Sequence, residues 1–375
     1  MALRIVLAGG GTAGHVNPLL ATATCLAQRG HECTVIGTRE GLEADLVPAA
    51  GFDLRFIPRV PLPRRPSLQF FSLPGRWSKA VDECVDILTG ADVLVGFGGY
   101  VSTPAYRAAQ KLGIPVVIHE QNARPGLANR LGARFARIVA LTFTSTPLSA
   151  LQGTTHVTGL PLRPAIEKLA KERHTEDGRR AARQLAASEL GIVPDAPTIL
   201  ITGGSLGALH INEVMAGLAR ELPPGVQVLH LTGHGKDEPV RRAVDEAGVG
   251  DRWHVFDYVT DMEKVLAVAD LVVCRSGAGT VAEMTALGLP CIYVPLPIGN
   301  GEQRLNAGDH VAAGGAVLIE NPDFTADTAR TSVYDLIGSA KLEQMAEVSL
   351  SLGRVNAAED LAKLIELTAK TQEED

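Results

Sequence analysis

The sequence predicts an α/β protein made of two Rossmann-like domains that face each other across a cleft. Three observations predict this fold. The chain has 375 residues, which is more than one ordinary hydrophobic core accommodates. Short apolar runs alternate with helix-like stretches, a pattern typical of a parallel sheet. An opening of strand, glycine turn and helix occurs twice, roughly 195 residues apart, which indicates two copies of one architecture.

The first half opens with an apolar run at Leu3–Ala8 that ends in glycines. Helical spacing of apolar residues over His15–Arg29 then predicts a helix, so this opening is a strand, a turn and a helix. Further strands are expected at 33–37, 93–97, 116–119 and 138–141. We expect this first domain to cover residues 1–163.

The same pattern restarts after a charged, alanine-rich stretch at 168–188. Thr198–Thr202 leads into a second glycine turn, and the second domain is expected to cover residues 164–350. Its other strands are expected at 226–231, 253–256, 271–274 and 291–294. The segment 356–370 places leucines and an isoleucine on one face and predicts an amphipathic helix.

Composition excludes several classes of protein. Hydrophobic residues make up 46% and charged residues 21%, and no apolar run approaches the length of a membrane span, so a globular protein is expected. The first residues lack the pattern of a secretion signal. Five scattered cysteines without a C-x-x-C pair argue against a disulfide framework and a zinc site, and favour a reducing cytoplasm.

Charge is distributed unequally between the two halves. Residues 1–163 carry 16 Lys and Arg against 10 Asp and Glu, a net charge of +6, whereas residues 164–375 carry 19 against 32, a net charge of −13. A basic half in an acidic protein indicates one face for an anionic partner. Because no RNA- or DNA-binding motif is present, we expect an anionic membrane surface as partner and no nucleic acid.

The stretch 59–79 is the strongest candidate for such a surface. It contains five basic residues and no acid, interleaved with leucines and aromatic residues, the composition of an interfacial patch. The alternative is that its apolar groups belong to the core. A second acid-free run, which contains Arg124, Arg130, Arg134 and Arg137, favours the patch. The residues expected in the patch are Arg64, Arg65, Leu68, Phe70, Phe71, Trp77 and Lys79.

The first glycine turn, Gly9–Gly14, satisfies G-x-G-x-x-G between a strand and a helix, so its amides could hold an anion. A dinucleotide site would also have an acid at the end of the second strand, but that strand ends Gly37-Thr38-Arg39. Arg39 could suit a 2′-phosphate, which leaves an NADP site open. His15 follows the turn directly, where a helix N-terminus favours its neutral, basic form; alternatively it only caps the turn.

Polar residues follow four other predicted strands. In open α/β sheets ligands bind beyond the carboxyl ends of the strands. The stretches 98–104 and 119–122 should therefore line the same site as His15, and the polarity of 119–122 is difficult to explain by packing. Glu283 lies one turn into the helix after 275–279, where a carboxylate can bind both ribose hydroxyls or simply stabilise the helix dipole. Gln303 and Asn306 could bind sugar hydroxyls or cap their loop.

Together these segments resemble the MurG family of UDP-N-acetylglucosamine transferases, which convert undecaprenyl-linked lipid I to lipid II in peptidoglycan synthesis. The resemblance covers nearly the whole chain. Its motifs are GGGTAGHVNP (9–18), GFGGYVS (96–102), HEQN (119–122), GLPLR (159–163), GGSLGALHIN (203–212), RSGAGTVAE (275–283) and GEQRLNA (301–307). The family implies a GT-B architecture with an N-terminal acceptor domain, a C-terminal UDP-sugar domain and a final helix that returns to the first domain.

The resemblance also implies roles for individual residues. Glu283 would bind the ribose, Val259 the uracil through its backbone, and Glu302 and Gln303 the sugar hydroxyls. The pyrophosphate would lie at Ser205 and at Ser276, Gly277, Ala278, Gly279 and Thr280. Arg163, Asn212, Thr12, Gly14 and Asn122 would complete the donor side. The acceptor would be surrounded by Gly11, Thr12, Ala13, His15, Tyr100, Glu120 and Asn122.

Three positions depart from the family pattern and leave the donor contacts open. Leu206 and Glu302 stand where many members have Gln, and Thr103 replaces a frequent Gly.

The implied reaction is an inverting displacement in which the acceptor C4 hydroxyl attacks the anomeric carbon, with His15 as first candidate base and Glu120 as second. The family implies no cofactor, no obligatory metal, and a peripheral position on the cytoplasmic face of the membrane. Alternatives are a UDP-sugar epimerase, another lipid-directed glycosyltransferase, an NADP oxidoreductase and a non-catalytic nucleotide-sugar sensor.

Overall fold

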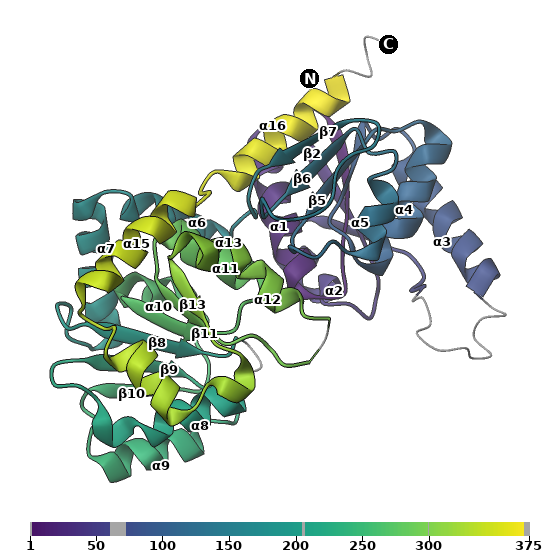
Figure 1. Cartoon of the computed structure of the whole chain (residues 1–375). Helices are drawn as coiled ribbons and strands as arrows, with labels where there is room; N and C mark the ends of the chain where they lie inside the picture. The colour runs from purple at the N-terminus through teal and green to yellow at the C-terminus, as the bar shows by residue number, and fades with distance from the viewer. Residues whose placement is uncertain (1, 61–72, 205–206, 299, 371–375) are drawn as a thin grey trace. The chain divides into compact units, whose positions relative to one another are not determined.

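Two separate parallel sheets organise the chain in the computed structural model, which describes residues 2–60, 73–204, 207–298 and 300–370. Each sheet forms the centre of one compact unit (Figure 1). The first unit comprises Met1–Arg163 and Asn356–Asp375, and the second comprises Pro164–Val355. All five cysteines are free thiols.

The sheet of the first unit has the strand order β3-β2-β1-β4-β5-β6-β7, and all its strand pairs are parallel. Its strands are β1 (Arg4–Ala8), β2 (Glu32–Gly37), β3 (Asp53–Phe56), β4 (Val93–Gly96), β5 (Val116–Glu120), β6 (Ile138–Leu141) and β7 (Thr154–Val157). Its helices are α1 (Ala13–Gln28), α2 (Glu43–Ala49), α3 (Leu73–Leu88), α4 (Gly99–Leu112), α5 (Leu127–Gly132) and α16 (Ala357–Lys370).

Alternate residues of the first sheet bury two different cores, because successive side chains of a strand point to opposite faces. Val6 and Ala8 of β1 pack with residues of α3, α4 and α5. Ile5 and Leu7 pack with residues of α1 and α16. Since both faces are covered by helices, the central strands consist almost entirely of apolar residues.

The last helix, α16, packs against the first sheet, as the colours of Figure 1 show. Leu361 and Ile365 are fully buried in the core that α1 shares with the sheet. Glu366 of the same helix accepts two hydrogen bonds from Arg29, at 2.7 and 2.8 Å. Residues distant in sequence therefore complete one hydrophobic core.

The sheet of the second unit has the order β10-β9-β8-β11-β12-β13 and is also parallel. Its strands are β8 (Thr198–Thr202), β9 (Gln227–Leu231), β10 (Trp253–Phe256), β11 (Leu271–Cys274), β12 (Cys291–Tyr293) and β13 (Ala316–Leu318). Its α-helices are α6 (Pro164–Arg173), α7 (Glu176–Leu190), α8 (Leu209–Gly217), α9 (Glu238–Ala247), α10 (Met262–Val268), α11 (Ala278–Leu287), α12 (Glu302–Asn306), α13 (Gly308–Ala313), α14 (Ala326–Ala329) and α15 (Ala340–Leu352). Short helical turns lie at η2 (Ala219–Glu221), η3 (Asn321–Asp323) and η4 (Arg330–Tyr334).

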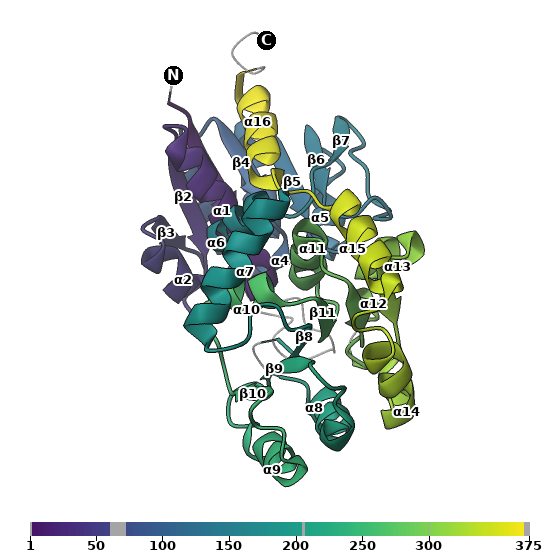
Figure 2. The same ribbon diagram turned by 90° about the vertical axis from the view of Figure 1, so that its left-hand side faces the viewer.

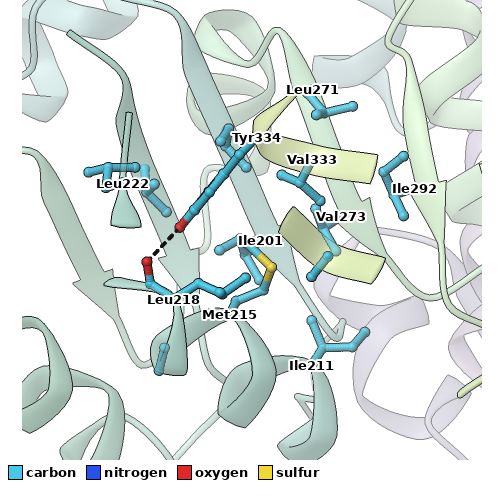
Figure 3. Packing of buried hydrophobic residues seen from close by; sticks show 14 of the residues in the cluster. Ile201, Ile211, Met215, Leu218, Leu222, Leu271, Val273, Ile292, Val333 and Tyr334 are labelled. Carbon is cyan, nitrogen blue, oxygen red and sulfur yellow. Dashed lines mark hydrogen bonds between the residues drawn. The ribbon is translucent and has the colours of Figure 1, made fainter. Parts of the chain in front are cut away.

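One face of the second sheet carries an extensive apolar cluster. Figure 2 shows α8 and α9 lying side by side near β9 and β10. Ile201 and Val273 from the sheet pack there with Met215 of α8 (Figure 3). The hydroxyl of Tyr334 donates a hydrogen bond to the carbonyl of Leu218 at 3.1 Å, so the ring is buried without leaving its polar atom unsatisfied (Figure 3).

All ten expected strands agree with the structure to within one residue at either end, but three further strands of the described residues were not predicted. The missed strands are β3, β7 and β13, and each lies at an edge of its sheet. Edge strands are short and partly exposed, so they lack the continuous apolar run that marks a central strand. The second unit extends to Val355, and the amphipathic helix expected over 356–370 is observed as α16.

Candidate functional site

Each sheet has one point where the direction of its connections reverses, and ligands of open α/β sheets bind at such points. In the first sheet this point lies between β1 and β4, and in the second sheet between β8 and β11. Four of the motifs found in the sequence, at 9–18, 96–102, 203–212 and 275–283, follow or overlap the ends of these four strands. The structure therefore places the predicted residues in two groups, one in each unit.

In the first unit, the turn after β1 directly contacts the turn after β4. A Cβ atom at Gly99 would lie 2.7 Å from the carbonyl oxygen of Gly10, so only glycine allows this approach. Gly98 and Gly99 also adopt positive φ angles of 86° and 78°. The buried Ser102 hydroxyl bonds the carbonyls of Ala8 and Gly98 at 2.8 and 2.7 Å, which ties the second turn to the end of β1.

His15 is half-buried in the first turn of α1, and its ring contacts the side chain of Thr12, the residue before that helix. Its Nδ1 atom is 2.9 Å from the Thr12 hydroxyl, and Thr12 forms no capping bond to the helix. Burial lowers the pKa of His15 below its usual value of 6.5, and Glu43 opposes this shift in part. The imidazole is therefore neutral at pH 7. When Nδ1 donates its proton to Thr12, Nε2 carries the lone pair that a general base requires.

Glu120, the second candidate base, is enclosed by hydrogen-bond donors. Its carboxylate accepts bonds from the backbone N–H groups of Asn122 and Gly126, each at 3.0 Å, and from Asn129 Nδ2 at 2.9 Å. The residue is only 2% exposed, and burial raises its pKa despite these bonds. This geometry suits a group that shapes the loop after β5 better than one that takes a proton from a substrate.

Its neighbours His119 and Gln121 are also buried and bonded internally. His119 Nε2 lies 2.9 Å from the carbonyl of Gly159, and Gln121 Nε2 donates to the carbonyl of His119 at 2.9 Å. Burial lowers the pKa of His119 to about 4. Hydrogen bonds to the loop itself, to α5 and to Gly159 thus engage His119, Glu120 and Gln121, whose polarity the sequence left difficult to explain by packing.

Asn129 was not predicted as a site residue, yet it connects the turn after β4 with Glu120 at the end of β5. Its amide accepts a hydrogen bond from the Tyr106 hydroxyl at 2.8 Å and donates to Glu120. A Cβ atom at Gly98 would lie 3.3 Å from Asn129 Nδ2 and 3.5 Å from His15 Cδ2, so both side chains converge on that glycine. Nothing in the local sequence distinguishes Asn129 from an ordinary helical residue of α5.

Tyr100 lies over the first glycine turn. A Cβ atom at Gly11 would be 3.0 Å from the Tyr100 ring, and the Tyr100 hydroxyl is 3.0 Å from the hydroxyl of Thr38. The guanidinium of Arg59 lies 5.2 Å from the ring centroid, a cation–π distance. Arg39, which could have suited a 2′-phosphate, lies instead over the ring of Phe56 at 4.5 Å.

Five residues of the expected membrane patch, Arg64, Arg65, Leu68, Phe70 and Phe71, lie outside the described residues. Of the other two, Trp77 is half-buried and packs against the core of the first unit, so part of its ring serves the fold. The Lys79 side chain is 71% exposed. In the second acid-free run, Leu127 and Leu131 of α5 are exposed, at 56% and 37%.

In the second unit, the glycine turn after β8 and the loop after β9 are held together. Ser205 lies outside the described residues. A Cβ atom at Gly207 would collide with the Thr232 carbonyl oxygen. Asn212 is buried and donates to that same carbonyl at 2.9 Å, while its own oxygen lies 3.1 Å from His230 Nε2. Asn212 thus supports the loop.

The turn after β11 leads into α11. Among the described turns of the second unit, it has the features of an anion-binding site. Gly277 precedes the helix in extended conformation without a side-chain cap, and the first amides of a helix have no partner within it. Ser276 is fully buried, and its hydroxyl has no hydrogen-bond partner. Gly277, Ala278, Gly279, Thr280 and Glu283 are all half-buried, so the small residues leave the helix start accessible to a ligand.

The remaining donor candidates lie on neighbouring loops. Val259 is half-buried between β10 and α10. Gln303 is half-buried and accepts a bond from the Leu296 amide at 2.9 Å, whereas Glu302 is exposed at the start of α12. Arg163 is half-buried and is the last residue of the first unit before α6.

Among the described residues, no group of three or more His, Cys, Asp or Glu side chains is placed to hold a metal ion. The helices of the described part of the chain include none that is both long enough and apolar enough to cross a bilayer.

Two parallel-sheet units, each with a glycine turn and a helix start at its switch point, define a glycosyltransferase of the GT-B class. Comparison with known proteins agrees. The glycosyltransferase family 28 N-terminal domain matches residues 5–141, and the C-terminal domain of the same family matches residues 198–365.

Similar proteins narrow the class to one family. A relative from Bifidobacterium adolescentis is 48% identical over 96% of both chains, and one from Paenarthrobacter aurescens is 47% identical over 97% of this chain and 95% of the relative. Both are named UDP-N-acetylglucosamine–N-acetylmuramyl-(pentapeptide) pyrophosphoryl-undecaprenol N-acetylglucosamine transferase. The crystal structure of Acinetobacter baumannii MurG superposes with a TM-score of 0.77 at 28% identity, covering 97% of this chain and 99% of that one. The chain belongs to the MurG family.

Proposed function

We propose that this protein transfers N-acetylglucosamine from UDP-N-acetylglucosamine to the C4 hydroxyl of the muramyl sugar of lipid I, giving lipid II. The observation that carries the proposal is the 48% identity to a transferase of this name across both units. Near-complete coverage matters because the donor and acceptor groups of residues lie in different units. An epimerase, a sensor or an NADP enzyme would not be expected to be 48% identical to that relative over 96% of both chains.

The second unit is the proposed donor site. The start of α11 has no side-chain cap, so its amides would bind the pyrophosphate, and the positive end of the helix dipole would stabilise the charge on departing UDP. Glu283 lies one turn further along and would accept hydrogen bonds from the ribose hydroxyls. Gln303 and Glu302 would contact the sugar, and Val259 the uracil.

The first unit is the proposed acceptor site, with His15 as the general base. Its lowered pKa keeps the ring neutral near pH 7, and Thr12 orients it so that Nε2 can accept a proton. The acceptor oxygen would then attack the anomeric carbon from the face opposite UDP, which inverts its configuration. Tyr100, Gly11 and Ala13 would surround the acceptor, with Glu120 and Asn122 shaping the loop beside it.

A transfer assay tests this proposal. Radiolabelled UDP-N-acetylglucosamine and a short-chain lipid I analogue are incubated with the protein, with UDP-glucose and UDP-N-acetylgalactosamine as alternative donors. We expect labelled disaccharide product from UDP-N-acetylglucosamine alone. Label that stays on UDP, appears only as free sugar, or is epimerised at the nucleotide level would contradict the proposal.

We also propose that the first unit binds an anionic membrane surface, where its lipid-linked substrate would be found. Support comes from the net charge of +6 in residues 1–163 and from the exposed Leu127 and Leu131, which lie among arginines without an intervening acid. Cosedimentation with vesicles containing 30% phosphatidylglycerol tests this. We expect binding that weakens when Arg130 and Arg134 become Glu, but not when Arg241 and Arg242 of α9 do. Equal loss in both double variants would contradict a surface confined to the first unit.

A further inference from the structure

Glu43, the first residue of α2, is a fully buried carboxylate that the mechanism above does not use. Its Oε2 accepts a hydrogen bond from the backbone N–H of Gly11 at 2.9 Å. Its Oε1 accepts two more, from the backbone N–H of Thr38 at 3.0 Å and from the Thr38 hydroxyl at 2.9 Å. One side chain therefore joins the glycine turn after β1 to the end of β2.

Glycines enclose this carboxylate. A Cβ atom at Gly10 would lie 2.5 Å from Oε1, one at Gly37 would lie 2.5 Å from Cγ, and one at Gly41 would collide with the carboxylate itself. Three backbone segments thus approach the carboxylate as closely as glycine permits. This close packing, together with the hydrogen bond to Gly11, makes the position of the turn depend on Glu43.

The same carboxylate controls the hydroxyl of Tyr100 through Thr38. Because the Thr38 hydroxyl donates its proton to Glu43, it can only accept at its 3.0 Å contact with Tyr100. The Tyr100 hydroxyl is therefore the donor, and its lone pairs are directed away from Thr38. The Tyr100 ring also covers Gly11, whose amide is held by the other oxygen of Glu43.

The position of this carboxylate is informative. A dinucleotide-binding fold has an acid at the end of the second strand that binds a ribose. Here that strand ends without an acid, and Glu43 supplies a carboxylate at the same place from the following helix, directed at the protein's own glycine turn. Gly11 N–H is thereby engaged and is not offered to a nucleotide pyrophosphate.

We propose that Glu43 is a positioning residue of the acceptor site, which fixes the Gly11 turn and the Tyr100 hydroxyl in the arrangement that the lipid-linked acceptor recognises. The inference rests on the proposed function. It predicts that Glu43 affects recognition of the acceptor and leaves recognition of the donor in the second unit unchanged.

The test variant is Glu43→Gln, which preserves volume but replaces one acceptor oxygen by an NH₂ group. Whichever way the amide is oriented, that group faces the N–H of either Gly11 or Thr38, a donor opposite a donor in a buried place. Thr38→Val is a second variant, which removes only the hydroxyl link to Tyr100. Glu366→Gln is the matched control, because Glu366 also joins two elements of the first unit by accepting several bonds.

Steady-state kinetics are measured with each substrate varied separately, beside hydrogen–deuterium exchange of the peptide containing Gly11. For Glu43→Gln we expect the KM for the lipid I analogue to rise about tenfold, the KM for UDP-N-acetylglucosamine to change less than about twofold, and the Gly11 amide to exchange faster. Thr38→Val should shift the acceptor KM in the same direction by a smaller factor. The control should change neither KM nor the exchange at Gly11.

Either of two kinetic results would overturn the inference: an unchanged acceptor KM in both variants, or equal changes in the acceptor KM and the donor KM. If Glu43→Gln does not fold, Thr38→Val decides alone. The exchange measurement does not depend on activity. A wild-type protein that transfers no sugar would therefore refute the proposed function, whereas unchanged exchange at Gly11 in Glu43→Gln would refute this inference.

Discussion

The glycine turns of the two units resemble each other in sequence but differ in what they already bind. In the first unit, the Gly11 amide is bonded to Glu43 and the Thr12 hydroxyl contacts His15. In the second unit, the helix start at Gly277 has no side-chain cap, and the Ser276 hydroxyl has no partner. One turn is satisfied by the protein itself, and the other offers donors to a ligand.

This difference teaches that a glycine-rich turn alone does not identify a nucleotide site. The G-x-G-x-x-G spacing occurs in the first unit, where a carboxylate has already engaged the turn. The second unit lacks the spacing in its turn after β8, yet its α11 start fits a diphosphate better. Which amides remain available decides the ligand, and that depends on side chains from elsewhere in the fold.

The prediction with the largest expected effect tests whether His15, in the first unit, acts in the chemistry and not in UDP binding. His15→Ala should reduce turnover about a thousandfold, since general base catalysis contributes on the order of 10² to 10⁴. UDP affinity, measured by calorimetry, should stay nearly the same because the proposed UDP site lies in the other unit. Weakened UDP binding together with retained turnover would assign His15 to the donor and not to the chemistry.

The second prediction removes the proposed ribose ligand. Glu283→Ala should raise the KM for UDP-N-acetylglucosamine by roughly tenfold to a hundredfold, because hydrogen bonds to a charged group contribute about 1.5–3 kcal/mol. The acceptor KM should remain unchanged. Glu246→Ala, an exposed carboxylate on α9, is the control and should behave like the wild type. An effect on the acceptor alone would contradict the division of roles between the units.

Much of this fold follows from the sequence because buried parallel strands consist of apolar runs. Thr198–Thr202 and Ile138–Leu141 were predicted with their observed bounds, and both lie inside their sheets. Strand β7 was missed because its residues Thr154–Val157 are mostly exposed and polar. Periodicity reports burial, so it fails where a strand is not buried.

The site was predicted as a set of motifs but not as a network. Motif order placed His15 and Tyr100 after the correct strands, and Glu120 is the last residue of β5 rather than the first residue after it. The sequence could not show that Glu120 is enclosed by hydrogen-bond donors, because one of them comes from Asn129 on α5. Nor could it identify Glu43, whose partners Gly11 and Thr38 lie on two different strand ends; the only local signal is the pair of glycines that flank it, Gly37 and Gly41.

The third prediction separates stability from activity within the first unit. The hydrogen bond from Arg29 holds the pKa of Glu366 at about 2, below its usual 4.5. Since the pKa is depressed in the folded state, the stabilisation is present above pH 4.5 and is lost as the pH falls towards 2. Glu366→Gln should therefore lower the free energy of unfolding by about 1–2 kcal/mol at pH 7, because solvent partly screens the pair, with no change in either KM.

Chemical denaturation at pH 7 and at pH 3 measures this effect, and the difference from wild type should shrink at the lower pH. Glu359→Gln is the control, because its ion pair with Lys363 lies on the exposed side of the same helix. A loss of activity in Glu366→Gln without a loss of stability would show that α16 acts on the site.

The last prediction concerns pH and decides between the two candidate bases. Burial lowers the pKa of His15, so the group becomes protonated and inactive only below pH 6.5, and kcat/KM for the acceptor should have its acid limb there. Burial raises the pKa of Glu120, which moves its titration towards that of His15. The variant Glu120→Gln distinguishes the two candidate bases, because it has no titrating carboxylate at position 120. If the acid limb of kcat/KM persists at its original pH in this variant, the limb belongs to His15. A limb that vanishes in Glu120→Gln would instead make the enclosed carboxylate the base.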